Sequence, residues 1–297
     1  MRTLPPVMQA VPVRTVIIGV IFAALWASAS TAGKFGLRSA EPLYLFTFRF
    51  LVAGTLMLSY SRLISRDRWP LRNEWKPLLV FGLFNTTLYL GIFISALDFL
   101  TAGITSLAIA LNPLIMSIFS SLILRRRVQP AEWLAISIGV SGVALATWPL
   151  VEAEHASPAG VALIFVCMLT YSYGSIFYSS VEWKLSRLAI NGWQVLFGGV
   201  MLLPLAWLQH ETPASFDTRF WLSELWLIFP VSIVSVQLWL YLLREDPVRA
   251  SMWLFLCPIF GLSVSTVMLD EPFSWHTVAG TVLVLAALYM GQRMAKK

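Results

Sequence analysis

Charged residues are scarce in this sequence. Asp, Glu, Lys and Arg make up 12% of its 297 residues, about half the usual share of a soluble domain. Hydrophobic residues make up 58%, and the mean hydropathy is +0.76. A soluble chain of this size needs far more polar surface, so the composition argues against a cytosolic enzyme, a nucleic-acid-binding protein and a disordered protein. It favours a chain that uses lipid as its solvent.

Groups that carry covalent or metal chemistry are also few. The two cysteines, Cys167 and Cys257, lie in apolar runs and form neither a disulfide framework nor a metal site. The three histidines lie far apart, without the spacing of metal ligands. The sequence has no phosphate-binding loop and no G-x-S-x-G elbow. We therefore expect no cofactor, no metal and no enzymatic activity.

What the sequence has in abundance is apolar segments long enough to cross a bilayer, which takes about 20 residues. The ten segments are 15–33, 43–61, 77–97, 102–124, 131–149, 159–181, 192–208, 224–243, 249–269 and 274–292. Because lipid cannot hydrogen-bond the backbone, segments of this length must be helices. The predicted fold is an all-α integral membrane protein with ten transmembrane helices.

The first segment has a second interpretation. Arg2 and Arg14, followed by an apolar run and Ala27-Ser28-Ala29, imitate a signal peptide with its cleavage site. Cleavage would leave nine helices and place the new N-terminus outside.

The basic residues are distributed unequally between the two sides. The two tails and the even-numbered connections hold 17 of the 21 Lys and Arg residues. The odd-numbered connections hold Lys34, Arg38 and Arg219, and Arg49 lies within a segment. Because basic residues accumulate on the cytoplasmic side, this asymmetry predicts that both termini are cytoplasmic.

Carboxylates are missing from the segment centres. No Asp or Glu lies at the centre of any predicted segment. Proton-driven pumps usually need a buried carboxylate or a histidine relay. This absence favours facilitated diffusion or exchange, or coupling through groups at the segment ends.

The two halves of the sequence align at a constant offset of 145 residues. The matched pairs include Trp26 with Tyr171, Arg49 with Gln194, Leu51 with Leu196, Gly54 with Gly199, Ser106 with Ser251 and Pro113 with Pro258. Each half carries five segments, and because five is odd, the second half must enter the membrane from the opposite side. We predict two inverted five-helix repeats, at 1–150 and 151–297. Chance alignment of two apolar halves is the alternative.

Several motifs resemble those of a known family. They are Leu25-Trp26-Ala27-Ser28, Phe48-Arg49-Phe50, Ala110-Leu111-Asn112-Pro113-Leu114, Cys257-Pro258-Ile259 and Met268-Leu269-Asp270-Glu271-Pro272. With these motifs the chain resembles the drug/metabolite transporter superfamily, of the EamA type with two five-helix repeats. Within it, the chain looks most like YddG-type exporters, which move aromatic and other apolar amino acids out of bacteria. A departure is Arg125-Arg126-Arg127, where many members carry Glu.

Polar and aromatic residues at membrane depth predict a common cavity. The candidate substrate-binding residues are Trp26, Ser28, Asn85, Tyr89, Asn112, Tyr171, Ser175, Tyr178, Gln237, Ser251 and Trp253. Aromatic walls bind an apolar side chain by stacking and hold an ammonium group by cation–π attraction. Asn and Tyr side chains could hold a carboxylate. Hydrogen bonding between helices is the alternative role for each polar residue.

Two prolines are candidate hinges. Pro113 and Pro258 lack an N–H group, which leaves the carbonyls of Ile109 and Leu254 without their helical partners. Symmetric pivots with carbonyls facing a cavity are one interpretation, and static kinks filled by packing are the other. Arg49, the charge within a segment, has either a structural or a gating role.

The sequence predicts a secondary transporter of a bacterial inner membrane that works by alternating access. Its expected cargo is small amphipathic metabolites, most of all aromatic and other apolar amino acids. Drug-like or unrelated metabolites are the alternative cargo, and a membrane enzyme or sensor with a buried ligand is the alternative class. The expected partners are this small-molecule substrate and the lipid bilayer, with no nucleic acid. A monomer is compatible with the sequence, which does not determine the oligomeric state.

Overall fold

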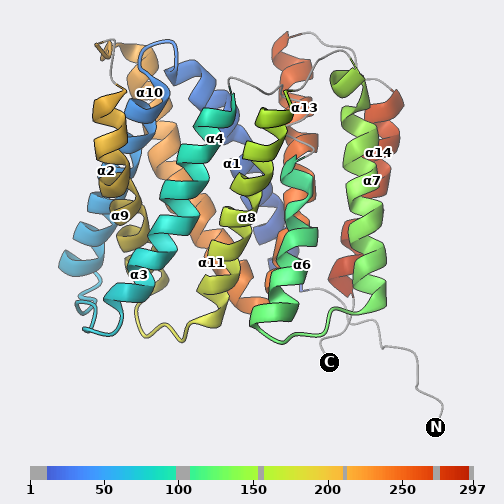
Figure 1. The fold of residues 1–297 in the computed structure, drawn as a ribbon, viewed down its shortest axis with the longest axis horizontal. Helices are drawn as coiled ribbons and strands as arrows, with labels where there is room; N and C mark the ends of the chain where they lie inside the picture. Colours follow the sequence, from blue (N-terminus) through green and yellow to red (C-terminus); the bar gives the residue numbers. More distant parts are fainter. Residues whose placement is uncertain (1–11, 98–107, 153–156, 210–212, 270–274, 294–297) are drawn as a thin grey trace.

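The computed structural model describes residues 12–97, 108–152, 157–209, 213–269 and 275–293. Within these ranges every regular element is a helix, and the helices stand side by side in one bundle (Figure 1). The elements are α1 (Val13–Gly36), α2 (Pro42–Leu63), α3 (Trp75–Gly82), η1 (Leu83–Leu88), α4 (Tyr89–Leu97), α6 (Asn112–Ile123), α7 (Pro130–Glu152), α8 (Pro158–Ser180), α9 (Arg187–Leu208), α10 (Thr218–Trp226), η2 (Leu227–Ser235), α11 (Val236–Glu245), α12 (Pro247–Met252), η3 (Trp253–Phe255), α13 (Leu256–Leu269) and α14 (Trp275–Arg293).

The chain is an integral membrane protein with several spans. Seven described helices are long and apolar enough to cross a bilayer. The fourth and ninth predicted segments are described as shorter apolar helices, Ala108–Ile123 and Pro247–Gly261. A total of ten spanning helices therefore stays a prediction. The motif at 270–272 lies outside the described residues.

The sequence marks several helix starts by proline or by a capping side chain. α2, α7, α8 and α12 begin at Pro42, Pro130, Pro158 and Pro247. Proline fits the first turn of a helix, where its missing N–H would have no partner in any case. α10 is capped by Asp217, whose carboxylate accepts a hydrogen bond of 2.9 Å from the Phe220 N–H. These signals fix where the apolar stretches enter helical structure.

The third membrane helix of each half contains a π-helical segment. In the first half η1 joins α3 to α4, and in the second half η2 joins α10 to α11. Moved by the repeat offset of 145, η1 falls inside η2. π-helical turns are rare and occur mostly at functional sites. Matching irregularities in both halves indicate that they belong to the working parts of the fold.

Contacts between connections define the two ends of the bundle. Arg126, between α6 and α7, bonds to Asp246, between α11 and α12, and Ser186 before α9 bonds to Asp67 after α2. We call this end the basic face, and it is the lower end in Figure 1. At the other end, the opposite face, the backbone N–H of Ser215 donates to the Ser39 carbonyl. This grouping matches the even and odd connections of the sequence.

Corresponding helices of the two halves pack closely in antiparallel pairs, α2 with α9 and α7 with α14. A Cβ atom on Gly54 would lie 2.7–2.9 Å from Leu196, and one on Gly199 would lie 3.1–3.2 Å from Phe50 and Leu51. Leu51 and Leu196 are partners at the repeat offset, so the contacts are reciprocal. Reciprocal contacts are typical of a two-fold relation between the pieces that meet.

Gly54→Ala is expected to destabilise the protein because the added methyl group meets the backbone of α9 at Leu196. Overpacking of this kind costs about 1–3 kcal/mol. Gly261→Ala is the matched control, since a Cβ there would have no heavy atom within 4 Å. Thermal unfolding in detergent should show a lower midpoint for Gly54→Ala and an unchanged or higher one for Gly261→Ala, because Ala is the better helix former. Equal midpoints for the two variants would contradict the close crossing of α2 and α9.

Candidate substrate-binding site

Aromatic rings from both halves meet in the middle of the bundle. Trp26 lies 5.9 Å from Tyr171 between ring centroids, and Tyr89 lies 4.9 Å from Tyr171. Tyr171 stacks on Trp239 at 6.0 Å, and Trp239 stacks on Phe22 at 4.9 Å. We call these five residues the central aromatic cluster. They come from α1, α4, α8 and α11, so both halves contribute to it.

The position of the cluster follows from the repeat. Trp26 and Tyr171 are partners at the offset of 145, and they contact each other directly. Two equivalent residues can touch only near the axis that relates their repeats. The cluster therefore lies where the two halves meet, as expected of a site shared between repeats.

Polar atoms inside the cluster have no hydrogen-bond partner among the residues that the structure describes. The Tyr171 hydroxyl and the Trp239 indole N–H are buried and make no hydrogen bond. The Ser175 hydroxyl, one turn after Tyr171 on α8, is also unpartnered. A buried polar group without a hydrogen bond costs free energy. Trp26 and Tyr89 are only partly buried, so the cluster combines stacking surfaces with donors that a bound molecule can satisfy.

Three of the predicted binding residues, Trp26, Tyr89 and Tyr171, come together in the cluster. Trp239 and Phe22 were not predicted, because a sequence with 13 Trp and 19 Phe gives no sign of which ones meet. Asn85 lies against both α8 and α9: a Cβ atom on Gly174 would lie 3.1 Å from it, and its amide donates to Gln194 at 3.4 Å.

Asn112 and Ser28 already have partners within the protein. The Asn112 amide donates 3.0 Å to the Ile109 carbonyl, which is the group that Pro113 leaves unpaired. Its oxygen accepts from Ser172 of α8 at 2.9 Å. The Ser28 hydroxyl accepts from the Trp226 indole N–H at 2.9 Å. These bonds fasten α6 to α8 and α1 to α10.

The remaining predicted binding residues make their contacts outside the cluster. Tyr178 packs against Phe81 at 5.3 Å, and Gln237 donates 3.2 Å to the Arg187 carbonyl at the start of α9. Ser251 donates 2.6 Å to the Val248 carbonyl within α12. Trp253 lies in η3, tight against Gly19 of α1. The structure does not bring these four residues into the cluster.

A family model described as the EamA-like transporter family matches residues 13–148 and again residues 158–291. The chain belongs to this family. The match covers each half once, so the two repeats are shown, and α1 is part of the first. Members of the family are transporters and not enzymes, and this chain is therefore a transporter.

Individual relatives of this EamA-like transporter are distant but cover nearly all of it. An uncharacterized transporter of Synechocystis sp. is 25% identical over 90% of this chain and 86% of its own. A probable amino-acid metabolite efflux pump of Salmonella typhimurium is 24% identical, over 92% and 93% of the two chains. One crystal structure matches with a TM-score of 0.78 at 18% identity, covering 94% of this chain and 96% of its own. This last likeness concerns the fold alone.

The helices of this transporter break next to both candidate hinge prolines. In the first repeat a turn at Leu111 separates Ala108–Ala110 from α6, and Pro113 lies in the first turn of α6. In the second repeat the 3₁₀ segment η3 separates α12 from α13, which contains Pro258. A helix interrupted in this way can bend as two pieces. The breaks fall at corresponding places in the two repeats.

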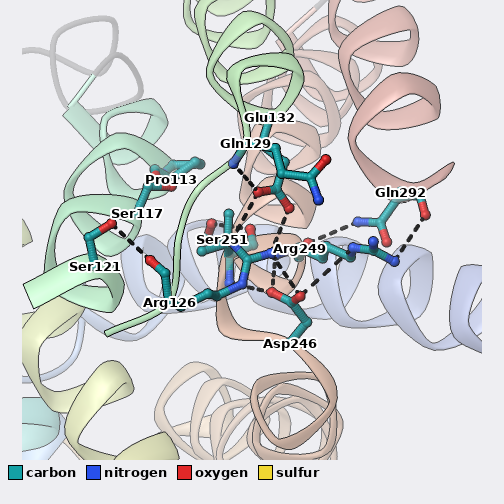
Figure 2. Close-up of polar contacts among 11 residues, drawn as sticks. Pro113, Ser117, Ser121, Arg126, Gln129, Glu132, Asp246, Arg249, Ser251 and Gln292 are labelled. Carbon is teal, nitrogen blue, oxygen red and sulfur yellow. Dashed lines mark hydrogen bonds and ion pairs between the residues drawn. The ribbon is translucent and has the colours of Figure 1, made fainter. Parts of the chain in front are cut away.

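An ion-pair network joins the two repeats at the basic face (Figure 2). The Arg126 guanidinium lies 2.6 Å from the Glu132 carboxylate on its own repeat and 3.0 Å from the Asp246 carboxylate on the other. Asp246 also accepts from the N–H groups of Val248 and Arg249, which caps α12. Gln292 of α14 donates 2.8 Å to the Arg249 carbonyl. The network fastens α6, α7, α12 and α14 together.

A similar bidentate pair between an arginine and a glutamate, here called a fork, lies entirely within the first repeat. Arg68 donates two hydrogen bonds of 2.7 Å to Glu74. This guanidinium holds the pKa of the Glu74 carboxyl below its ordinary value. Burial acts to lower the pKa of Arg126, but its bonds to Glu132 and Asp246 raise it overall. The two forks share their geometry, yet only Arg126 reaches across to the other repeat in the described part of the chain.

Proposed function

We propose that this EamA-like transporter exports small amphipathic metabolites, most of all aromatic and other apolar amino acids, by alternating access between two inverted repeats. The observation that carries the proposal is the central aromatic cluster, with unpartnered donors at the junction of the repeats. The aromatic faces suit an apolar side chain, and the Tyr171 hydroxyl and Trp239 N–H suit a carboxylate. The Salmonella relative, a probable amino-acid metabolite efflux pump, supports a cargo of this class.

Alternating access requires that the repeats separate at one face while they meet at the other. The antiparallel packing of α2 with α9 and of α7 with α14 supports the inversion of the second repeat. The Arg126–Asp246 pair, which joins the repeats, acts as the gate of the basic face. The basic residues gathered there support a cytoplasmic position for this face in a bacterial inner membrane.

Binding of labelled phenylalanine to the purified protein in detergent tests the proposed cargo. Unlabelled tryptophan, tyrosine and leucine should displace it, because each presents an apolar side chain to the cluster. Aspartate and lysine should not, since no described charged side chain belongs to the cluster to compensate a second charge. Displacement by all amino acids alike, or by none, would contradict recognition of the apolar side chain by these rings.

A further inference from the structure

Glu224 is a buried carboxylate outside the central aromatic cluster. It is the seventh residue of α10, and Arg49 is the eighth residue of α2. Both helices begin at the opposite face, so at 1.5 Å per residue both side chains start about 10 Å below it. Glu224 is 1% exposed, and in the described part of the chain neither of its carboxylate oxygens has a hydrogen-bond partner. A carboxylate in such a place needs a counter-charge or a proton, because an isolated buried charge is very costly.

Among the described residues, Arg49 is the charged group that acts on Glu224. The two side chains interact electrostatically, but they form no ion pair within 4.0 Å. α10 packs on α1 and η2. η2 has no charged residue, and those of α1 are Arg14 at its far end and Lys34, which is exposed. The other charge on α2, Arg62, lies at the basic face with Asp67.

Arg49 instead begins a buried chain of hydrogen bonds across both repeats. Its Nε–H donates 2.7 Å to the Ser232 hydroxyl of η2. The Asn191 amide of α9 donates 2.9 Å to the Ser232 carbonyl, and Gln194 donates 3.0 Å to Asn191. Thr86 of η1 then donates 2.7 Å to the Gln194 side-chain oxygen. This polar chain ties α2 and η1 of one repeat to α9 and η2 of the other, and it includes both π-helical segments.

We propose that Glu224 is a proton-binding site that couples cargo export to proton uptake, with Arg49 as its switch partner. The proposal rests on the proposed export function. With Glu224 protonated, the neutral acid leaves Arg49 on Ser232, as in this structure. With Glu224 ionised, the carboxylate draws the Arg49 guanidinium toward itself and away from Ser232. The polar chain between the repeats then loses its first bond, so the proton state of Glu224 biases the packing of the repeats.

The proton balance of the cycle is simple. A proton from the outer solution forms an O–H bond at a Glu224 oxygen, and that bond breaks when the proton is released to the inner solution. One cargo molecule leaves the cell in the same cycle. Only the carboxylate changes its charge, and no oxidant, reductant or other reactant is required.

Proteoliposomes separate this coupling from transport itself. Wild-type protein with an acidic lumen and a clamped membrane potential should accumulate labelled phenylalanine above the level reached without a pH gradient. For exchange of one proton per cargo molecule, each pH unit is worth about tenfold in accumulation. Glu224→Gln should reduce that ratio to the level without a gradient and should keep phenylalanine counterflow. Glu182→Gln is the matched control, since Glu182 is exposed at the basic face, and it should behave as wild type.

Three results would overturn the proposal. The first is accumulation driven by the pH gradient that persists in Glu224→Gln. The second is a wild-type protein that shows counterflow but whose accumulation of phenylalanine does not respond to a pH gradient. The third is loss of both counterflow and accumulation in a folded Glu224→Gln protein, which would make Glu224 a ligand for the cargo. Absence of counterflow in wild type would instead contradict the proposed cargo. In that case the protonation of Glu224 is tested without cargo, by infrared difference spectra recorded between acidic and alkaline pH. A protonated carboxyl band that Glu224→Gln lacks and Glu182→Gln retains would support the site, and an unchanged band would contradict it.

Discussion

Tyr171→Phe is expected to raise the KM for phenylalanine exchange by about ten- to a hundredfold, since a hydrogen bond to a charged group is worth about 1.5–3 kcal/mol. The substitution removes the buried Tyr171 hydroxyl, which has no hydrogen-bond partner among the described residues, and retains the ring. The ring contacts with Trp26 and Tyr89 should therefore survive. Initial rates of exchange in proteoliposomes at several phenylalanine concentrations give the KM.

Stability supplies the independent readout for Tyr171→Phe. Because no internal hydrogen bond is lost, the melting temperature in detergent should stay the same or rise. Tyr173→Phe is the matched control, since Tyr173 lies on the same helix but packs against Phe84 and Phe119. It should leave the KM unchanged. An unchanged KM in Tyr171→Phe would show that the hydroxyl does not bind the cargo.

Arg126→Gln is expected to open the basic face. Arg126 is the cation that links Asp246 of the second repeat to Glu132 of the first, and both carboxylates are largely buried. Removing one partner of a fully buried ion pair costs about 3–5 kcal/mol. The cost here is smaller, because Arg126 is partly exposed and Asp246 keeps Arg249 at 3.8 Å. The cost falls on the state in which the basic face is closed, so the population shifts toward the open state. A bias of about 1.4 kcal/mol already changes the ratio of two states tenfold.

Cys257 reports this opening. Its thiol is buried in α13 and points at the Ala23 carbonyl of α1, which belongs to the other repeat. In a Cys167→Ser background, Arg126→Gln should speed the labelling of Cys257 by a thiol reagent applied from the basic face at least tenfold. Arg68→Gln breaks the similar fork within one repeat and should not change the labelling rate. Equal rates in the two variants would argue that the Arg126–Asp246 pair does not gate this face.

Much of the fold follows from the sequence because lipid imposes a simple rule on it. Apolar stretches must be helical, and basic residues mark one face, so the helices and the grouping of their connections could be predicted. The repeat offset pairs Trp26 with Tyr171, and the two rings do meet. The π-helical segments could not be predicted, because apolar periodicity does not distinguish a π turn from an α turn.

The rest of the site depends on partners that a single sequence does not reveal. Asn112 looked free to bind cargo, but its amide satisfies the carbonyl that Pro113 leaves unpaired. Glu224 is not among the predicted site residues because the apolar run of the sequence begins at this residue, which makes it look like a segment end. The helix itself begins earlier, at Thr218. Asp217 was the available signal, since an aspartate three residues before Phe220 is a good helix cap. Reading that cap would have placed Glu224 two turns inside the membrane helix.

Counterflow of phenylalanine tests the central claim most directly. Purified wild-type protein in proteoliposomes is loaded with unlabelled phenylalanine, and uptake of the labelled amino acid is followed with no ion gradient. Exchange through a carrier whose site faces each side in turn predicts transient accumulation of label above protein-free vesicles, followed by decay to equilibrium. Accumulation that tryptophan and leucine abolish would support the central aromatic cluster as the cargo site. Uptake no faster than in protein-free vesicles, with protein shown to be folded, would contradict export of aromatic amino acids.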